Sequence, residues 1–316
     1  MSHRTLAAFL VASVFSVCAP RAGAQGQCVS YQVDPRLEPF EIPENQVDWT
    51  IADALIVFSQ HLTLQDDGTT YKMRVLPWTN ITNFGPGCSN RDYHGQPGEL
   101  AIGSGVLVGR DRILTQQHVM WVADNCTGGP LCDITSFVFG FGNYSQEWHA
   151  TCDDPNDPSN CWVLVNASDV YTCKKQWDGC TNDPIGEWAV VQLDREVPDR
   201  TPLPIQRSDG PPPHLDLTVV GHPNRIPMKV ESVQLLYSSP GEYGINGHLL
   251  FGNSGSMVID DITGNVIGTV YGYNAFHTIA LACDPPPDSS ACYREDFVST
   301  GSFIVTPAYL AEGYIP

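Results

Sequence analysis

Basic residues are scarce in this sequence, and its interior contains no long apolar segment. The 316 residues include 16 Lys and Arg against 35 Asp and Glu, which gives a formal charge of −19. Nucleic-acid binding needs a basic surface for the phosphates, so this balance argues against a nucleic-acid partner. Beyond the N-terminus no apolar run approaches the roughly 20 residues of a transmembrane helix, so we expect no membrane insertion.

Cysteines at the spacing typical of zinc sites are also missing. No two cysteines stand at the C-x₂₋₄-C spacing of a structural zinc site, so we expect no metal and no cofactor. Long helical periods are absent as well, in keeping with 28 Gly and 25 Pro in the chain. Disorder is excluded by a hydrophobic content of 42%.

What the chain does contain is a series of short β-type runs, each bounded by Gly, Pro, Asn or Asp. Such strands without intervening helices predict an all-β sandwich or barrel. Two pairs of runs have hairpin spacing, 104–108 with 112–115 and 256–259 with 266–271. A helix is predicted only for the tail, 307–314. The other predicted strands are 188–193, 217–220 and 229–237.

The N-terminal segment 1–24 has the layout of a secretory signal peptide. Arg4 precedes an apolar run over 6–19, and small residues at 22–24 suit the cleavage position. We therefore expect a secreted protein, extracellular or periplasmic. Residues 25–97 are less legible, and could be an N-terminal extension, a propeptide or the opening strands of the main fold.

Ten cysteines remain after the signal segment, and an even number suits disulfides formed outside the cytosol. Eight are close neighbours in turn-rich stretches, which suggests local bridges, and the remaining two would then pair with each other. Sequence alone does not fix this connectivity, so it is a hypothesis. The expected pairs are Cys126 with Cys132, Cys152 with Cys161, Cys173 with Cys180, Cys283 with Cys292, and Cys28 with Cys88.

Three local patterns carry residues suited to acyl transfer. A hairpin ends on His118, Glu187 directly precedes a buried-type strand, and Ser254 lies in the turn Gly252-Asn-Ser-Gly-Ser256. Serine is a weak nucleophile until a base removes its proton, and that base needs an acid to hold its tautomer. The three residues supply one of each. The glycines of the turn would let the amides of Gly252 and Ser254 point at a developing oxyanion.

These motifs resemble those of the chymotrypsin-fold, trypsin-like serine peptidases. Leu114-Thr-Gln-Gln-His118 is similar to the family's T-A-A-H pattern, and the turn at Ser254 is similar to its G-D-S-G-G. The similarity is greater to the glutamyl endopeptidase-like branch, which typically has G-N-S-G-S-P, G-Y-P and V-I-G-I-H elements. The corresponding segments here are Gly252-Asn-Ser-Gly-Ser-Met257, Gly221-His-Pro223 and Val266-Ile-Gly-Thr-Val270. The resemblance implies two six-stranded antiparallel β-barrels over 98–316, a short C-terminal helix, and the catalytic order His118, Glu187, Ser254.

Several positions depart from the family pattern. Glu187 stands where the family has Asp, and Asp183 is the fallback acid. Asn253 replaces the Asp that in trypsin pairs with a newly cut N-terminus, so activation by that route is not expected.

The residues expected to form the specificity pocket depart as well. They are His248, Leu249 and Val270, with Val270 where the branch has its glutamate-recognising His. An apolar or uncharged residue before the scissile bond is expected, because burying an unpaired carboxylate is costly. A His248 side chain that points into the pocket would reverse that preference.

The sequence therefore predicts a secreted, monomeric serine endopeptidase acting on polypeptides. Its main rival is a catalytically inactive, protease-like binding module in which Glu187 has disabled the triad. A cysteine-rich structural glycoprotein would explain the cysteines, but it leaves the order of His118, Glu187 and Ser254 to coincidence.

Overall fold

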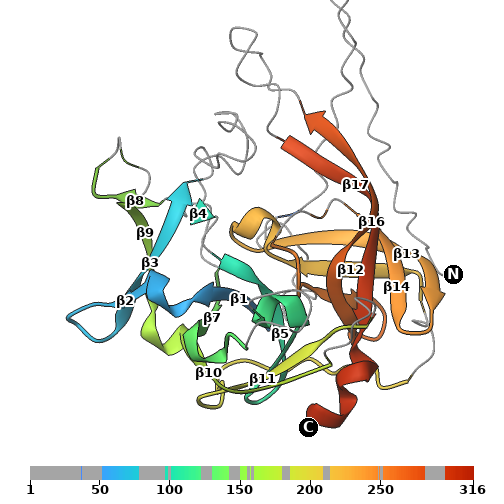
Figure 1. Cartoon of the computed structure of the whole chain (residues 1–316), viewed down its shortest axis with the longest axis horizontal. Helices are drawn as coiled ribbons and strands as arrows, with labels where there is room; N and C mark the ends of the chain where they lie inside the picture. Colours follow the sequence, from blue (N-terminus) through green and yellow to red (C-terminus); the bar gives the residue numbers. More distant parts are fainter. Residues whose placement is uncertain are drawn as a thin grey trace, which may run out of the picture.

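Strands make up nearly all the regular structure of the described residues. The structure is a computed structural model, shown in Figure 1. In the described parts of the chain, no helix has the length and apolar character needed to cross a bilayer. The described residues are 37, 52–77, 97–98, 101–121, 130–141, 150–154, 157, 160–179, 186–208, 214–247, 249, 252–281 and 296–316.

The first of two closed barrels is formed by the N-terminal half of the chain. All its strand pairs are antiparallel, and β7 pairs with β1 to close the ring. Closure leaves no unpaired strand edge. In order round the barrel the strands are β1 (Asp53–Phe58), β5 (Ala101–Gly109), β6 (Arg112–Thr115), β11 (Ala189–Leu193), β10 (Val170–Asp178) and β7 (Thr135–Phe139).

The second barrel, drawn in orange and red in Figure 1, has the same number of strands and is closed by the pairing of β12 with β15. Its strands in order are β12 (Asp216–Gly221), β13 (Lys229–Ser239), β14 (Glu242–Gly247), β17 (Asp296–Pro307), β16 (Val266–Leu281) and β15 (Met257–Asp260). The predicted hairpins are confirmed as β5–β6 and β15–β16. The prediction of an all-β fold with two six-stranded antiparallel barrels is therefore confirmed.

A further sheet covers the outside of the first barrel at β1, and it appears on the left of Figure 1. Leu55 and Val57 of β1 pack against this sheet, whereas Ala54 and Ile56 face the core that the barrels share. Burial on both faces explains why β1 has no alternating polar pattern. The sheet consists of β2 (Leu62–Leu64), β3 (Thr70–Pro77), β9 (Cys161–Asn166) and β8 (Thr151–Cys152), with β4 (Pro97–Gly98) paired to β3.

Residues 25–97 contribute structure to both barrels. β1 is a full member of the first barrel, and Leu37 pairs with Val230 of β13 through two backbone hydrogen bonds of 2.7 and 2.9 Å. Cleavage of the chain after β1 would remove one of six strands from a closed ring. Whether any of this segment is removed on maturation stays a prediction, and the proposed signal peptide at 1–24 lies outside the described residues.

One buried cluster joins the two barrels. It includes Ile56 and Val190 of the first barrel and Met257 and Val266 of the second. The chain ends in a 3₁₀ helix, η10 (Ala308–Tyr314), which confirms the predicted C-terminal helix. Buried side chains of η10 belong to this cluster, and the helix contacts both β16 of the second barrel and β11 of the first.

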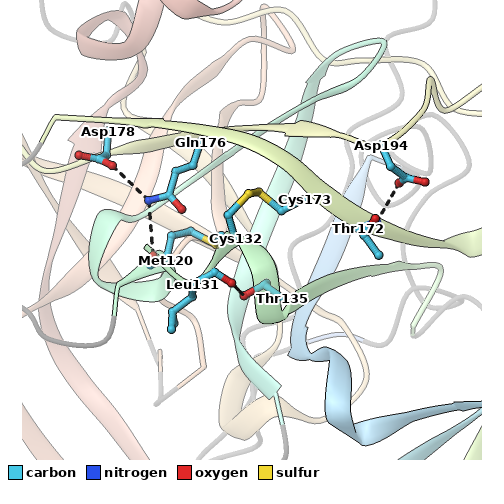
Figure 2. Close-up of a disulfide and its surroundings, with 9 residues drawn as sticks. All are labelled: Met120, Leu131, Cys132, Thr135, Thr172, Cys173, Gln176, Asp178 and Asp194. Atoms are coloured by element: carbon cyan, nitrogen blue, oxygen red, sulfur yellow. Dashed lines mark hydrogen bonds between the residues drawn. A yellow bond between two sulfur atoms is a disulfide. The ribbon is translucent and has the colours of Figure 1, made fainter. Parts of the chain in front are cut away.

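Three of the predicted disulfides can be tested: one is confirmed and two are wrong. Cys152 and Cys161 are bonded as expected. Cys132, however, bonds to Cys173, with their Cα atoms 5.1 Å apart (Figure 2), so the expected Cys126–Cys132 and Cys173–Cys180 pairs are wrong. Of the ten cysteines that follow the signal segment, those outside the described residues are Cys28, Cys88, Cys126, Cys180, Cys283 and Cys292.

The cause of the Cys132–Cys173 pairing is a strand register. β10 runs antiparallel to β7 with Thr172 opposite Ser136, so the next residue of β10 lies beside the start of β7. The short helix η6 (Cys132–Ile134) leads directly into β7 at that point. Counting neighbours in the sequence cannot detect a contact made by strands 41 residues apart.

Removing the Cys132–Cys173 bridge is expected to destabilise the protein more than removing the other described bridge. Loop closure over 41 residues corresponds to about 4 kcal/mol of unfolding free energy, whereas 9 residues correspond to about 2.5 kcal/mol. Urea unfolding of the Cys132→Ala/Cys173→Ala and Cys152→Ala/Cys161→Ala double variants measures both. A larger loss for the shorter loop would contradict this ordering.

The β15–β16 hairpin, which directly follows the Ser254 turn, is held by a buried carboxylate. Asp260 accepts hydrogen bonds from the amides of Ile262 (2.9 Å) and Thr263 (2.8 Å), and its other oxygen lies 2.8 Å from His214 Nδ1. Burial by itself raises the pKa of Asp260. The hydrogen bonds from Thr263, His214 and Ile262 outweigh that effect, and the pKa is lowered.

A lowered pKa in the folded state means that the charged Asp260 stabilises the fold above its unfolded pKa and that this contribution is lost as pH falls through the folded pKa. Asp260→Asn is therefore expected to lower the free energy of unfolding by about 2 kcal/mol at neutral pH. The difference in unfolding free energy between variant and wild type should narrow below about pH 4. Urea unfolding at both pH values measures this. The exposed Asp66→Asn variant is the control, and a gap independent of pH would contradict the assignment.

Candidate active site

His118 lies in the short helix η5 (Gln117–Met120), just after β6 ends at Thr115. The two residues after it, Val119 and Met120, are buried in the core shared by the barrels. These contacts hold η5 in place, while the His118 side chain stays 22% exposed. The backbone that carries His118 is therefore fixed by the core, while part of its ring remains accessible to solvent.

Glu187 contacts this histidine. Its Oε1 lies against His118 Nδ1 and accepts a hydrogen bond of 3.3 Å from the His118 backbone amide. The carboxylate is 5% exposed, so the contact is shielded from water. Gly186, with φ of +86°, turns the chain immediately before Glu187 and β11.

Ser254 lies in a sharp turn ahead of β15. Gly252 and Gly255 have φ of +93° and +84°, a region that residues other than glycine rarely adopt. A Cβ at Gly255 would stand 1.9 Å from the backbone oxygen of Ser104, so the turn also needs glycine for close packing. Asn253, buried within the turn, accepts a 3.0 Å hydrogen bond from the Ser256 hydroxyl.

The serine and histidine segments meet between the barrels. A Cβ at Gly103 would lie 2.8 Å from the Ser254 carbonyl oxygen and 2.9 Å from Val119, the neighbour of His118. Tyr271 packs edge-on against the His118 ring with centroids 5.5 Å apart, and it follows Val270, whose carbonyl accepts the Gly255 amide. Within the described residues the Ser254 hydroxyl makes no hydrogen bond. Catalytic hydrogen bonds commonly tighten only when substrate binds.

This arrangement agrees with a family comparison. A model described as the trypsin-like peptidase domain matches residues 103–268, which is more than half of the chain and includes His118, Glu187 and Ser254. The chain belongs to the trypsin-like peptidase family.

Solved structures similar to this trypsin-like peptidase share little sequence with it. A Glu endopeptidase is 11% identical, with a TM-score of 0.49, over 89% of this chain and 95% of that one. Human heparin binding protein is 12% identical, with a TM-score of 0.45, over 90% and 95%. The Rv3671c protease of M. tuberculosis in its active form is 15% identical, with a TM-score of 0.42, over 94% and 92%. No curated protein matches the sequence of the chain.

Other expected site residues of this trypsin-like peptidase are only partly described. Leu249 and Val270 are buried in the core of the second barrel, and their part in a specificity pocket stays a prediction. His248 and the fallback acid Asp183 lie outside the described residues. Gly252 and Ser254 donate no backbone hydrogen bond within the described part of the chain, and their oxyanion role also stays a prediction.

Sequence reasoning missed the buried polar residues that hold the site of this trypsin-like peptidase together. Gln116 donates to the carbonyl and hydroxyl oxygens of Thr269 at 2.9 and 2.7 Å, and accepts from the Thr306 hydroxyl at 3.2 Å. All three are buried, so the bonds fix the segment before His118 to the second barrel. The sequence contained one sign of this role: Gln116, a polar residue, stands where the family's T-A-A-H pattern has alanine.

Proposed function

We infer that this trypsin-like peptidase is a secreted serine endopeptidase that hydrolyses polypeptides through Ser254, His118 and Glu187. The observation that carries the proposal is the buried contact of Glu187 with His118 Nδ1. A carboxylate at Nδ1 keeps the proton on that nitrogen, which leaves Nε2 free to act as a base. Glu187 therefore supports activity, although the family usually has Asp.

In the proposed acylation step, Ser254 Oγ attacks the carbonyl carbon of the scissile bond and its proton passes to His118 Nε2. The carbonyl oxygen becomes an oxyanion, which the amides of Gly252 and Ser254 would bind. Collapse of this intermediate breaks the C–N bond, and His118 gives the proton to the leaving amine. Glu187 stabilises the imidazolium that exists between the two transfers.

Deacylation repeats the sequence with water as the nucleophile. His118 accepts a proton from water, the resulting hydroxide attacks the acyl carbon, and the ester bond to Ser254 Oγ breaks as His118 returns the proton to it. The peptide acid leaves, and Ser254 and His118 are restored to their starting protonation states.

Secretion belongs to the same proposal. The Cys132–Cys173 and Cys152–Cys161 disulfides support an oxidising compartment, and the signal-like segment at 1–24 agrees with it. Cleavage after apolar or uncharged residues is proposed because Leu249 and Val270 are apolar. A mixed peptide library cut mainly after Glu or Lys would contradict that preference.

The test of the proposed function is labelling by a fluorophosphonate, which reacts only with an activated serine. The purified secreted protein is treated before and after limited proteolysis, and the modified residue is located by peptide mass mapping. Labelling at Ser254 is the expected result. Absence of labelling under both conditions would contradict the proposal and favour the inactive binding module.

A further inference from the structure

Ser104 of β5 takes part in four hydrogen bonds that connect it to the Ser254 turn and to the segments beside it. Its hydroxyl donates to the Gly252 carbonyl at 2.9 Å and accepts the His222 amide at 3.2 Å. Its backbone amide donates to the Ser254 carbonyl at 2.8 Å, and its carbonyl accepts the Thr115 hydroxyl at 2.6 Å. Ser104 is fully buried, so every one of its polar groups has a partner inside the protein.

Two of these bonds, those to the Gly252 and Ser254 carbonyls, restrict the peptide group that carries the Ser254 N–H, which is expected to bind the oxyanion. The Gly252 carbonyl belongs to the peptide plane before Asn253, and the Ser254 carbonyl belongs to the plane after Ser254. The plane between them carries the Ser254 N–H. This middle plane is held by its own carbonyl, that of Asn253, which accepts the Ser256 amide at 2.8 Å, and Ser104 holds the planes on both sides of it. The Ser254 N–H therefore has little freedom to turn away, although glycine at 252 and 255 would allow the turn other conformations.

A buried contact between a histidine and a carboxylate in turn holds His222, whose backbone amide is the donor to the Ser104 hydroxyl. His222 Nε2 lies 2.6 Å from Asp53 Oδ2, and its Nδ1 donates to the Ile226 carbonyl at 3.0 Å. The side chains of His222 and Asp53 are 0% and 3% exposed. Asp53 comes from β1 of the first barrel and His222 follows β12 of the second, so the pair holds the barrels together beside the turn.

Close packing leaves this region little space to rearrange. A Cβ at Gly252 would lie 2.5 Å from the His222 carbonyl oxygen, and one at Gly221 would lie 1.8 Å from Ser256 Oγ. The backbone on both sides of His222 therefore touches the turn directly. The chain of contacts runs from Asp53 through His222 and Ser104 to Gly252.

We propose that Ser104 is a positioning residue for the oxyanion hole, and that Asp53 and His222 hold it in place. This rests on the proposed function, because it assigns Ser104 a part in the reaction at Ser254. Ser104 touches neither substrate nor reacting atoms; it acts by orienting the Ser254 N–H. Substrate binding to the rest of the site does not depend on it.

The test is the Ser104→Ala variant of the secreted protein, assayed on a peptide substrate. Removing an oxyanion donor outright costs about 10²- to 10³-fold, so loosening one is expected to lower kcat by about tenfold to a hundredfold. KM should change by less than about twofold, since the loss falls on the transition state. Affinity for a peptide boronic acid, whose tetrahedral adduct places an oxygen in the hole, should fall in parallel with kcat/KM.

Two further variants separate positioning from stability. Thr135→Val removes an equally buried hydroxyl that donates to the Leu131 carbonyl at 2.7 Å, on a strand that takes no part in the turn, and it should leave kcat unchanged. Ser104→Cys fills the same space with a slightly larger side chain that donates only weakly, so its kcat should lie between wild type and Ser104→Ala. It serves as the test if Ser104→Ala does not fold.

The outcomes distinguish this inference from the function on which it rests. Wild-type protein that neither hydrolyses peptides nor reacts at Ser254 contradicts the proposed function, and with it any positioning role. Active wild type together with wild-type kcat in a folded Ser104→Ala or Ser104→Cys variant contradicts only the inference. A fall in kcat as large in Thr135→Val would also overturn it.

Discussion

Replacing Ser254 by alanine is expected to lower kcat by about 10⁵- to 10⁶-fold while leaving the fold intact. Ser254 Oγ is the protein atom that bonds to the acyl carbon in the proposed reaction, so nothing else in the turn replaces it. The loss of one partly exposed hydroxyl that has no hydrogen-bond partner among the described residues should cost little stability. Initial rates on a peptide substrate and thermal unfolding of the same preparation measure both effects.

The matched control for that variant lies two residues away. Ser256→Ala removes a fully buried hydroxyl that donates to Asn253 Oδ1 at 3.0 Å in the same turn. It should lose some stability, about 1 kcal/mol for one hydrogen bond, and keep most of its kcat. Hydrolysis that persists in Ser254→Ala would mean that the activity comes from another nucleophile or from a contaminating peptidase.

The sequence allowed prediction of the strands closest to the motifs, and the structure shows why others were missed. β6 was predicted with its observed bounds, because its hairpin has a short polar connection and a clear apolar run. β1 is buried on both faces by the barrel core and the outer sheet, so it shows no alternation to recognise. Strand content in 25–97 could not be separated from an extension or a propeptide by local pattern alone.

Cysteine pairing failed for a related reason. Neighbouring cysteines are a good guess when a bridge closes a loop within one hairpin, as Cys152 and Cys161 do on the paired strands β8 and β9. Cys132 and Cys173 are brought together by the register of β7 and β10, which is set by the whole barrel. No local feature of the sequence encodes that register.

The candidate site likewise combines residues that local motifs reveal with residues that only the folded barrels bring together. His118, Glu187 and Ser254 stand in short motifs with glycines and strand starts around them, so pattern and order suffice to select them. Ser104 and Gly252 are 148 residues apart, and Gln116 and Thr269 are 153 apart. Their hydrogen bonds exist only because the two barrels dock, and buried Ser or Gln side chains carry no mark of their partners in the sequence.

Glu187 is the residue on which the peptidase and the inactive binding module make opposite predictions. Glu187→Gln keeps the size of the side chain but removes the charge, and the amide can donate a proton towards His118 Nδ1 and favour the wrong tautomer. Loss of the triad acid in this way costs on the order of 10⁴-fold in kcat, and we expect a loss of that size. Stability should change less, since the amide oxygen can still accept the His118 backbone amide.

Glu187→Asp tests the same point in the other direction. The variant restores the acid that is usual in the family, but its side chain is one methylene shorter. In the wild type Glu187 Oε1 contacts both His118 Nδ1 and the His118 backbone amide, and the shorter side chain would draw the carboxylate away from both. A working Glu187 therefore predicts that Asp lowers kcat, by about tenfold to a hundredfold, because misplacing a catalytic group by about 1 Å is costly. If glutamate had instead disabled the triad, aspartate would raise the activity above that of wild type. Steady-state kinetics of wild type, Glu187→Asp and Glu187→Gln thus decide which reading holds, and a gain in Glu187→Asp would exclude Glu187 as a functioning third member of the triad.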